Sequence, residues 1–221
     1  YNSFVHPQSG FQITNNKLRL SKMGAIDILL HREIKGKIKT LTIKKTPTNK
    51  WYACFSCEME NKIKSPLSKE VIGIDVGLTH FYTDSKGNKV DNPKYLLKSE
   101  KRLSLLQRKL SNKRLGSNNK DKLRLKVAKL YEKVTNQRSD FLHKEARKLV
   151  NTYSRIAVEQ LYIKNMIKNH CLAKSINDAS WNKFLQILSY KVEETGGQVV
   201  GVNSRGTSQY CICGNKVRKS L

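Results

Sequence analysis

The sequence predicts a mixed α/β fold in which an α/β domain with a long basic helical-hairpin insertion follows a small antiparallel β-barrel. Three observations predict this architecture. Residues 1–67 contain short segments in which apolar and polar residues alternate. Residues 71–79 are an apolar, β-branched run that ends in one acid between two glycines. Residues 94–150 then change to the heptad-like leucine spacing of helices.

The first 67 residues are predicted to form a basic antiparallel unit, either a barrel or a sandwich. Asn15-Asn16 suits a hairpin turn between two short strands. The segment 37–44 alternates strictly, so one face of its strand is apolar and the other carries Lys37 and Lys39. This cationic face can follow a phosphate backbone, although a merely solvated strand face is the alternative.

Composition restricts the classes of partner. The 221 residues hold 43 Lys and Arg against 17 Asp and Glu, a formal charge of +26, so a polyanion is expected and nucleic acid is the leading candidate. A membrane surface is second, but no apolar run approaches the ~18 residues of a membrane helix. The odd number of cysteines, five, indicates reduced thiols and a cytoplasmic, nucleoid-associated protein. We expect no small-molecule cofactor.

Asp75 and Glu159 are the candidate catalytic residues. Asp75 ends the apolar run 71–76, and Glu159 ends a second run of the same form, 154–159. Carboxylates that end neighbouring strands of one sheet can share a divalent ion, and oxygen ligands suit Mg²⁺ or Mn²⁺. For Asp75 alone, a turn-capping role is the alternative.

The predicted hairpin of residues 94–150 breaks at residues 116–119 and carries few acids. Helices whose exposed faces are only solvated usually mix charges of both signs, so this hairpin is interpreted as an arm that grips a polyanion. Its candidate nucleic-acid-binding residues are Lys101, Arg102, Arg108, Lys109, Lys113, Arg114 and Arg138.

The remaining chain predicts a polar connection over residues 164–177, an amphipathic helix over 180–194 and a strand over 198–202. His170-Cys171 is interpreted as an incidental pair in the connection. Asp178 is interpreted as a cap of the helix that follows it. Cys54 and Cys57 have C-x-x-C spacing, but residues three apart in a strand point to opposite faces, so no metal site is assigned.

Several short motifs follow one another in a fixed order along residues 1–214. The motifs are Leu29-Leu30-His31-Arg32, Gly36-Lys37-Ile38-Lys39-Thr40, Gly73-Ile74-Asp75-Val76-Gly77, Asn92-Pro93-Lys94-Tyr95-Leu96, Asn136-Gln137-Arg138, Asp140-Phe141-Leu142-His143-Lys144, Val158-Glu159, Asp178-Ala179-Ser180-Trp181 and Thr207-Ser208-Gln209. In this order they resemble the TnpB/OrfB family, transposon-encoded, RuvC-like RNA-guided DNA nucleases related to the type V CRISPR effectors. Each motif alone is short, and their order makes the resemblance specific.

The resemblance implies three segments. Residues 1–67 would be a wedge-like nucleic-acid-binding domain, and residues 68–205 an RNase H-like (RuvC) nuclease domain with the insertion 94–150. Residues 206–221 would begin a zinc ribbon through Cys211 and Cys213, which could hold Zn²⁺ only with ligands beyond Leu221. Asp75 and Glu159 would be the first two members of an Asp-Glu-Asp triad that binds Mg²⁺ or Mn²⁺. The implied partners are a guide RNA and a target DNA.

The departures from the family pattern change the expected activity. Family members carry a helical segment before the position of Tyr1, and a second cysteine pair and a final Asp after the first pair. We therefore expect a fragment with weak nuclease activity, and Asp178 is a poor substitute for the third acid. Two alternatives stay open: a non-catalytic nucleic-acid-binding remnant or module and, more distantly, an RNase H-like cut-and-paste transposase.

Overall fold

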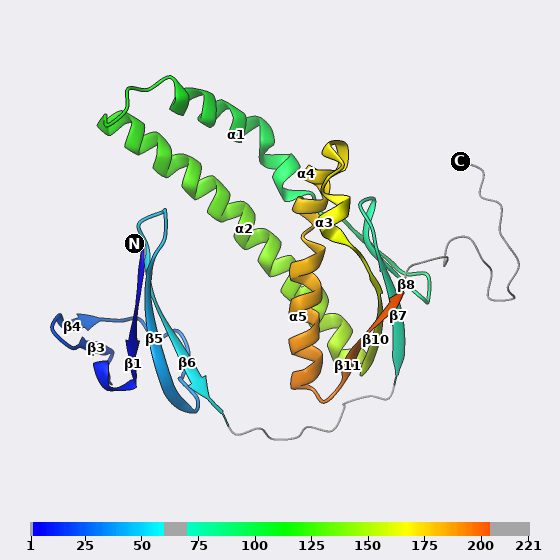
Figure 1. Cartoon of the computed structure of the whole chain (residues 1–221), viewed down its shortest axis with the longest axis horizontal. Coiled ribbons are helices and arrows are strands. Elements are labelled where there is room, and N and C mark those ends of the chain that lie inside the picture. The colour runs from blue at the N-terminus through cyan, green and yellow to red at the C-terminus, as the bar shows by residue number, and fades with distance from the viewer. Residues whose placement is uncertain (1, 60–69, 204–221) are drawn as a thin grey trace, which may run out of the picture. The chain divides into compact units, whose positions relative to one another are not determined.

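The structure is a computed structural model that describes residues 2–59 and 70–203 (Figure 1). The chain divides into two compact units, residues 1–62 with 109–132 and residues 63–108 with 133–221. The helical hairpin consists of α1 (Tyr95–Ser111) and α2 (Asn118–Thr152). Its tip is grouped with the first unit and its base with the second.

The first unit contains two three-stranded antiparallel sheets, with the strand orders β1-β5-β6 and β2-β3-β4. A short 3-10 helix, η1 (Gln8–Gly10), connects β1 to β2. The strands are β1 (Ser3–Pro7), β2 (Phe11–Thr14), β3 (Lys17–Leu20), β4 (Gly24–Asp27), β5 (Lys37–Lys45) and β6 (Trp51–Glu58).

The expected closed barrel is not found among the described residues, where the two sheets remain open and no strand of one pairs with a strand of the other. Leu18 and Leu20 of β3 instead share a small core with Leu41 and Ile43 of β5. The strands β2, β3 and β4 have only four residues each, which leaves little backbone for closure. Strand β1 was not predicted, and its terminal Pro7 is accommodated because β1 is an edge strand.

The predicted turn at Asn15-Asn16 is confirmed. Both residues have positive φ, 48° and 60°, which is the conformation of the two-residue hairpin turn that matches strand twist. A second turn, between β5 and β6, contacts helix α2 within the same unit. Thr48 Oγ1 and Lys50 Nζ each donate to the Glu132 carboxylate at 3.0 Å. This contact explains why the tip of the hairpin is grouped with the first unit.

The second unit is built on a five-stranded sheet with the order β11-β10-β7-β8-β9. Strands β7, β10 and β11 are parallel to one another, whereas β7, β8 and β9 form an antiparallel meander. The strands are β7 (Val71–Val76), β8 (His80–Asp84), β9 (Lys89–Asp91), β10 (Arg155–Gln160) and β11 (Gln198–Asn203).

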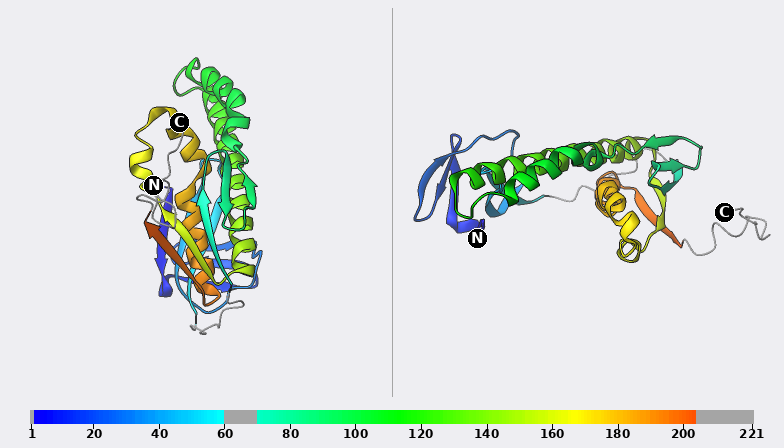
Figure 2. Two further views of the ribbon diagram at one scale, coloured as in Figure 1. Left: turned by 90° about the vertical axis from the view of Figure 1, so that its right-hand side faces the viewer. Right: turned by 90° about the horizontal axis from the view of Figure 1, so that it is seen from above.

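One face of this sheet is covered by helix α5 (Trp181–Glu194) and the C-terminal half of α2 (Figures 1 and 2). Leu142 of α2 and Phe184 of α5 are fully buried against Ile72 of β7 and Ile156 of β10. These apolar residues alternate along each strand with residues that face the other way. Helices therefore cover one face of the sheet, and every second side chain of β7 and β10 points toward the opposite face.

The expected polar connection over residues 164–177 is wrong. The structure has two helices there, α3 (Ile163–Met166) and α4 (His170–Ala179). Asn169 caps α4, because its side-chain oxygen accepts a hydrogen bond from the backbone N–H of Cys171. Ile176 and Ala179 are buried in the core of the unit. Two buried residues and one cap hold this helix, in which polar residues are interspersed among the apolar ones.

Asp178 does cap a helix, but not the helix that was predicted. It lies near the end of α4, and its carboxylate accepts from the backbone N–H of Leu96 at the start of α1. The same carboxylate binds Arg138 of α2, with Nη2 2.7 Å from Oδ1. The Asp178 side chain is only 8% exposed and the Arg138 side chain 20% exposed. The Asp178 carboxylate thus joins three helices of the second unit, α2 through the ion pair and α1 through the backbone hydrogen bonds.

No helix within residues 2–59 and 70–203 is both long enough and apolar enough to cross a lipid bilayer.

We expect Asp178→Ala to lower the free energy of unfolding of the second unit by about 3 kcal/mol, because a half-buried guanidinium loses its partner and α1 loses its cap. Urea unfolding followed by Trp181 fluorescence in a Trp51→Phe background measures this. The control is Asp140→Ala, which breaks an exposed pair with Lys144 in the same unit and should change stability by less than about 1 kcal/mol. Equal losses in the two variants would contradict a structural role for Asp178.

Candidate metal centre and nucleic-acid interface

Asp75 and Glu159 lie side by side at the same edge of the five-stranded sheet. Strands β7 and β10 are parallel and pair Ile74 with Val158, and the two acids are the next residues along each strand. Ile74 and Val158 are buried on the helix-covered face, so alternation turns both carboxylates toward the opposite face. Asp75 is exposed and Glu159 is partly buried.

The pKa of Glu159 is raised above its usual value. Partial burial is the largest cause, followed by the negative charge of Asp75 and a hydrogen bond between the two side chains. Both carboxylates are therefore close enough to repel each other when ionised. A bound cation would remove this repulsion and compensate the burial.

The end of β7 is held by a tight turn. The backbone N–H of Gly77 donates to the carbonyl of Phe81 at 3.1 Å. A Cβ built on Gly77 would come within 3.0 Å of the carbonyl oxygen of His80, so glycine allows the close approach of the two backbone segments. Asp75 itself pairs with Thr83 of β8. The turn thus follows directly after Val76, the last residue of β7, and Asp75 lies one residue before this strand end.

The donor set fits a hard divalent cation in part. Two adjacent carboxylates, one of them with a raised pKa, are suitable oxygen ligands for Mg²⁺ or Mn²⁺. However, no group of three or more His, Cys, Asp or Glu side chains that could hold a metal occurs among the described residues. Asp178 is engaged with Arg138 and α1, which leaves it unsuited as a third ligand.

The cysteines that were considered as zinc ligands do not form a site in the part of the chain that the structure describes. Cys211 and Cys213 lie outside the described residues. Cys54 is an exposed free thiol and Cys57 a half-buried one. The Cys171 sulfur lies 3.4 Å from His170 Nε2 in the first turn of α4, without a third metal ligand in the described segments.

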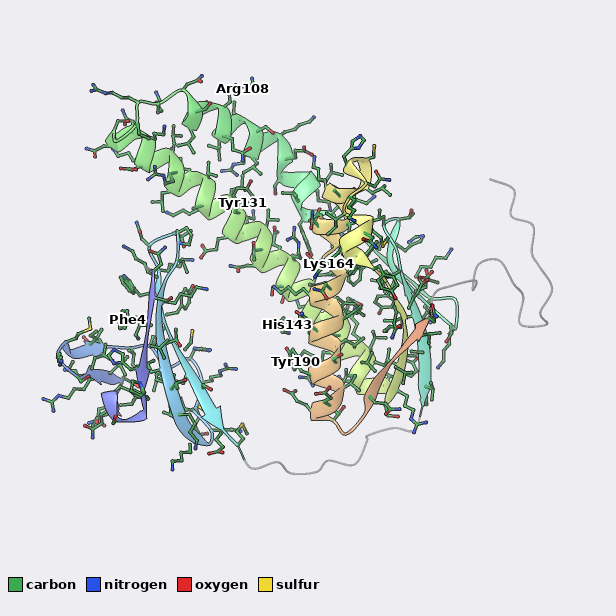
Figure 3. All side chains as sticks on the ribbon, in the orientation of Figure 1. Phe4, Arg108, Tyr131, His143, Lys164 and Tyr190 are labelled. Atoms are coloured by element: carbon green, nitrogen blue, oxygen red, sulfur yellow. The ribbon has the colours of Figure 1, made fainter. Side chains whose placement is uncertain are left out.

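The basic residues predicted to bind nucleic acid are mostly exposed. In α1 and the following turn these are Lys101, Arg102, Arg108, Lys109, Lys113 and Arg114, and Figure 3 labels Arg108 on the outer side of α1. Lys37 and Lys39 are exposed on β5, but Lys39 already pairs with Glu58 at 2.6 Å. The structure therefore leaves the α1 residues as the larger group of accessible cations.

Arg138 differs from the other predicted contacts. Its guanidinium binds Asp178, and its Nε atom is buried without a hydrogen-bond partner. A phosphate would have to compete with a buried carboxylate for this side chain. We therefore exclude Arg138 from the proposed interface. The sequence shows the positive charge of Arg138 but not its ion-pair partner, because Asp178 lies in α4, 40 residues further along the chain.

The sequence analysis also missed a group of polar residues on the outward side of α2 and α5. His143 and Arg147 of α2 lie beside Lys183, Tyr190 and Lys191 of α5. The i,i+4 spacing of His143 and Arg147 was the available signal, since such residues share one helix face. The spacing along α2 does not show, however, that this helix face lies beside α5.

The pH dependence of stability tests the contact between Asp75 and Glu159. With its pKa raised from 4.5, Glu159 holds its proton more tightly in the folded state. The bound proton of Glu159 makes its full contribution to the free energy of unfolding below the usual glutamate pKa. This contribution is lost as the pH rises through the raised pKa. Without divalent metal, Glu159→Gln should therefore gain stability relative to the parent as the pH rises above the usual glutamate pKa.

Urea midpoints of the parent and Glu159→Gln at several pH values measure this difference. Glu193→Gln, at an exposed position of α5, is the control, and its difference from the parent should stay constant. A difference for Glu159→Gln that is independent of pH would show that the two carboxylates do not interact.

Comparison with known proteins supports a relationship along most of the chain. A putative RNA-guided DNA endonuclease of Streptomyces pristinaespiralis is 33% identical over 204 residues, which cover 91% of this chain and 50% of that protein. The putative RNA-guided DNA endonuclease InsQ of Escherichia coli is 30% identical over 238 residues, covering 99% of this chain and 58% of that protein. The chain thus spans little more than half the length of these relatives.

The fold also resembles that of a chain in the Cas12f1–sgRNA–target DNA complex. The TM-score is 0.56 at 17% identity, over 81% of this chain and 39% of that one. Residues 181–220 match the Cas12f1-like TNB domain. Residues 54–170, more than half of the chain, match the OrfB_IS605 family, described as a probable transposase. The resemblance to TnpB/OrfB proteins is confirmed, and the chain belongs to this family.

Proposed function

We propose that the chain forms the nuclease part of a transposon-associated, RNA-guided DNA endonuclease of the TnpB type, which hydrolyses phosphodiester bonds with a divalent metal. The observation that carries this proposal is the position of Asp75 beside Glu159 at the ends of two parallel strands. The names of the two relatives, putative RNA-guided DNA endonucleases, support it.

Asp75 and Glu159 are the proposed ligands of Mg²⁺ or Mn²⁺. Divalent ions held by such carboxylates activate water and stabilise the leaving oxygen in phosphodiester hydrolysis. For this, Glu159 must lose its proton, which its raised pKa opposes. Metal affinity should therefore increase with pH, since protons and metal compete for the same oxygen atoms. A third carboxylate of the RuvC-like triad is not found among the described residues.

The proposed partners are a guide RNA and a target DNA. Sequence selection would come from base pairing with the guide, while basic protein surfaces hold the backbones. The exposed cations of α1 and the turn after it support this role. We retain residues 1–67 as a wedge-like domain, residues 68–205 as a RuvC-like domain with the insertion 94–150, and residues 206–221 as the start of a zinc ribbon that includes Cys211 and Cys213.

One observation favours a second function. Within the described segments no three metal-binding side chains meet, so the chain alone could bind nucleic acid without cutting it. Such a non-catalytic module would keep the basic surfaces and lack turnover. A cut-and-paste transposase is a more distant candidate, since it would use a DNA 3′-hydroxyl rather than water at the same carboxylates.

Metal titration distinguishes the two functions. We expect Mn²⁺ to bind the parent chain, with affinity at least about tenfold lower in both Asp75→Asn and Glu159→Gln because each variant loses a charged oxygen ligand. Isothermal titration calorimetry at neutral pH measures this. Asp91→Asn, at an exposed residue of the neighbouring strand β9, is the control. Absence of binding by the parent would favour the non-catalytic module.

RNA binding by the α1 surface is tested separately. The plot of log affinity against log salt should become shallower by roughly 1 for each phosphate that the protein no longer neutralises. The Lys101→Glu, Arg102→Glu, Lys109→Glu variant should therefore have a slope shallower by about 3 if each residue binds one phosphate.

A matched triple variant, Lys17→Glu, Lys89→Glu, Lys168→Glu, alters the net charge by the same amount at exposed positions elsewhere. Fluorescence anisotropy with a structured RNA measures both variants. Equal slopes for the two triple variants would mean that the α1 residues are only solvated.

A further inference from the structure

A second cationic surface lies on the helical layer of the second unit, away from the sheet. We call it the α2–α5 surface. It consists of Ser139, His143 and Arg147 of α2 and Lys183, Tyr190 and Lys191 of α5. His143, Arg147, Lys183 and Tyr190 are all exposed. Figure 3 labels His143 and Tyr190 on the side of α5 that faces away from the sheet.

Contacts between the two helices organise this surface. Lys183 Nζ donates to Ser139 Oγ at 3.0 Å, and Tyr190 Oη lies 3.4 Å from His143 Nδ1. Lys191 Nζ lies 5.5 Å from the centre of the Tyr190 ring, at the distance of a cation–π contact. Lys183 and Tyr190 are thus held by side chains of α2, whereas Lys191 contacts the neighbouring ring on its own helix.

The surface carries an excess of positive charge. Burial lowers the pKa of His143 most, and Lys191, Lys183 and Arg147 lower it further. Asp140 opposes them, but its carboxylate also binds Lys144 at 2.7 Å. The other facing acid is Glu194, which with burial raises the pKa of Tyr190. Three cations therefore face two acids, one of which is already engaged with Lys144, and His143 can add a fourth positive charge.

Lys191 is an unusual member of this surface. The residue is only 8% exposed, and no ion pair between Lys191 and a carboxylate is found among the described residues. Its Nζ atom is not among the buried, unpartnered polar atoms of the described residues, so the packed part is the aliphatic stem and the ammonium group stays accessible beside the Tyr190 ring. A phosphate that docked over Tyr190 and His143 would lie next to this positive charge.

We propose that the α2–α5 surface binds the sugar–phosphate backbone of an RNA strand, with phosphates contacting Arg147, Lys183 and the His143 ring. This inference rests on the proposed function, in which the chain holds a guide RNA. It adds a contact surface separate from the α1 arm. Positive charge and an exposed aromatic ring, Tyr190, are features of surfaces that bind such strands.

The position of the surface favours RNA over the strand that is cut. Asp75 and Glu159 face away from the helix-covered side of the sheet, whereas the α2–α5 surface lies on the outside of those helices. A strand held there is separated from the carboxylates by the whole helical layer. The row from Ser139 to Arg147 is about 12 Å long, which spans about three successive phosphates of one strand.

The test compares two double variants of the full chain with equal changes in charge. Arg147→Glu, Lys183→Glu alters the surface, and Lys89→Glu, Lys168→Glu alters exposed positions outside it. The probe is a 3′-labelled RNA of about 40 nucleotides that forms one hairpin with a single-stranded tail, beside DNA of the same sequence. Anisotropy at several salt concentrations gives affinity and slope. The neutral variant Arg147→Gln, Lys183→Gln repeats the comparison if the charge reversal impairs folding.

The surface variant should bind RNA at least about tenfold more weakly than the control, with a slope shallower by about 1 for each cation removed. In a ¹³C-histidine NMR titration, RNA should also raise the pKa of His143 in the parent, because phosphate favours the imidazolium form.

Equal affinities of the surface and control variants, or an unchanged His143 titration, would overturn this inference and leave the proposed function intact. A surface effect on DNA binding but not on RNA binding would overturn it as well. If the parent binds no RNA, both this inference and the guide-RNA part of the proposed function fail.

Discussion

The parallel pairing of β7 with β10 is the constraint on which the candidate site depends. It brings together Asp75 and Glu159, which the helical hairpin separates in sequence, and it sets their register through the pair Ile74 and Val158. A shift by one residue would turn one carboxylate into the apolar core, since successive side chains point to opposite faces. The buried side chains of β7, β10, α2 and α5 oppose such a shift. Packing on one face therefore fixes the chemistry on the other.

A second constraint joins the helical hairpin to this unit. Asp178 accepts from the first turn of α1 and binds Arg138 of α2, so one carboxylate holds both helices at the base of the hairpin. The same interaction changes the interpretation of two residues. Arg138 becomes a structural cation rather than a nucleic-acid contact, and Asp178 becomes unavailable as a third metal ligand. Each of these residues had suggested a function when its sequence position alone was considered. In the fold, their opposite charges form an ion pair.

The five-stranded sheet separates an acidic site on one side from a basic surface on the other. The carboxylates gather on one face, where burial and their mutual repulsion raise the pKa of Glu159. The helices on the other face present cations outward, where burial and the neighbouring positive charges lower the pKa of His143. Each site holds charges that a counter-ion would stabilise, a cation for the acids and a phosphate for the bases. With the two proposed ligands bound, the acidic and the basic site would lie on opposite sides of the sheet, so that neither charge would cancel the other.

The sequence by itself determined the strands ending at Asp75 and Glu159, the Asn15-Asn16 turn, the two long helices and the family, because periodicity, turn residues and motif order are local properties of the chain. It missed β1, which is held by its pairing with β5, and α4, which is held by a few buried contacts. Only the tertiary structure decided that the antiparallel sheets stay open, that Arg138 binds Asp178, and that His143 meets Tyr190. These outcomes depend on which distant segments pack together, and residue spacing along one segment carries no information about its partner.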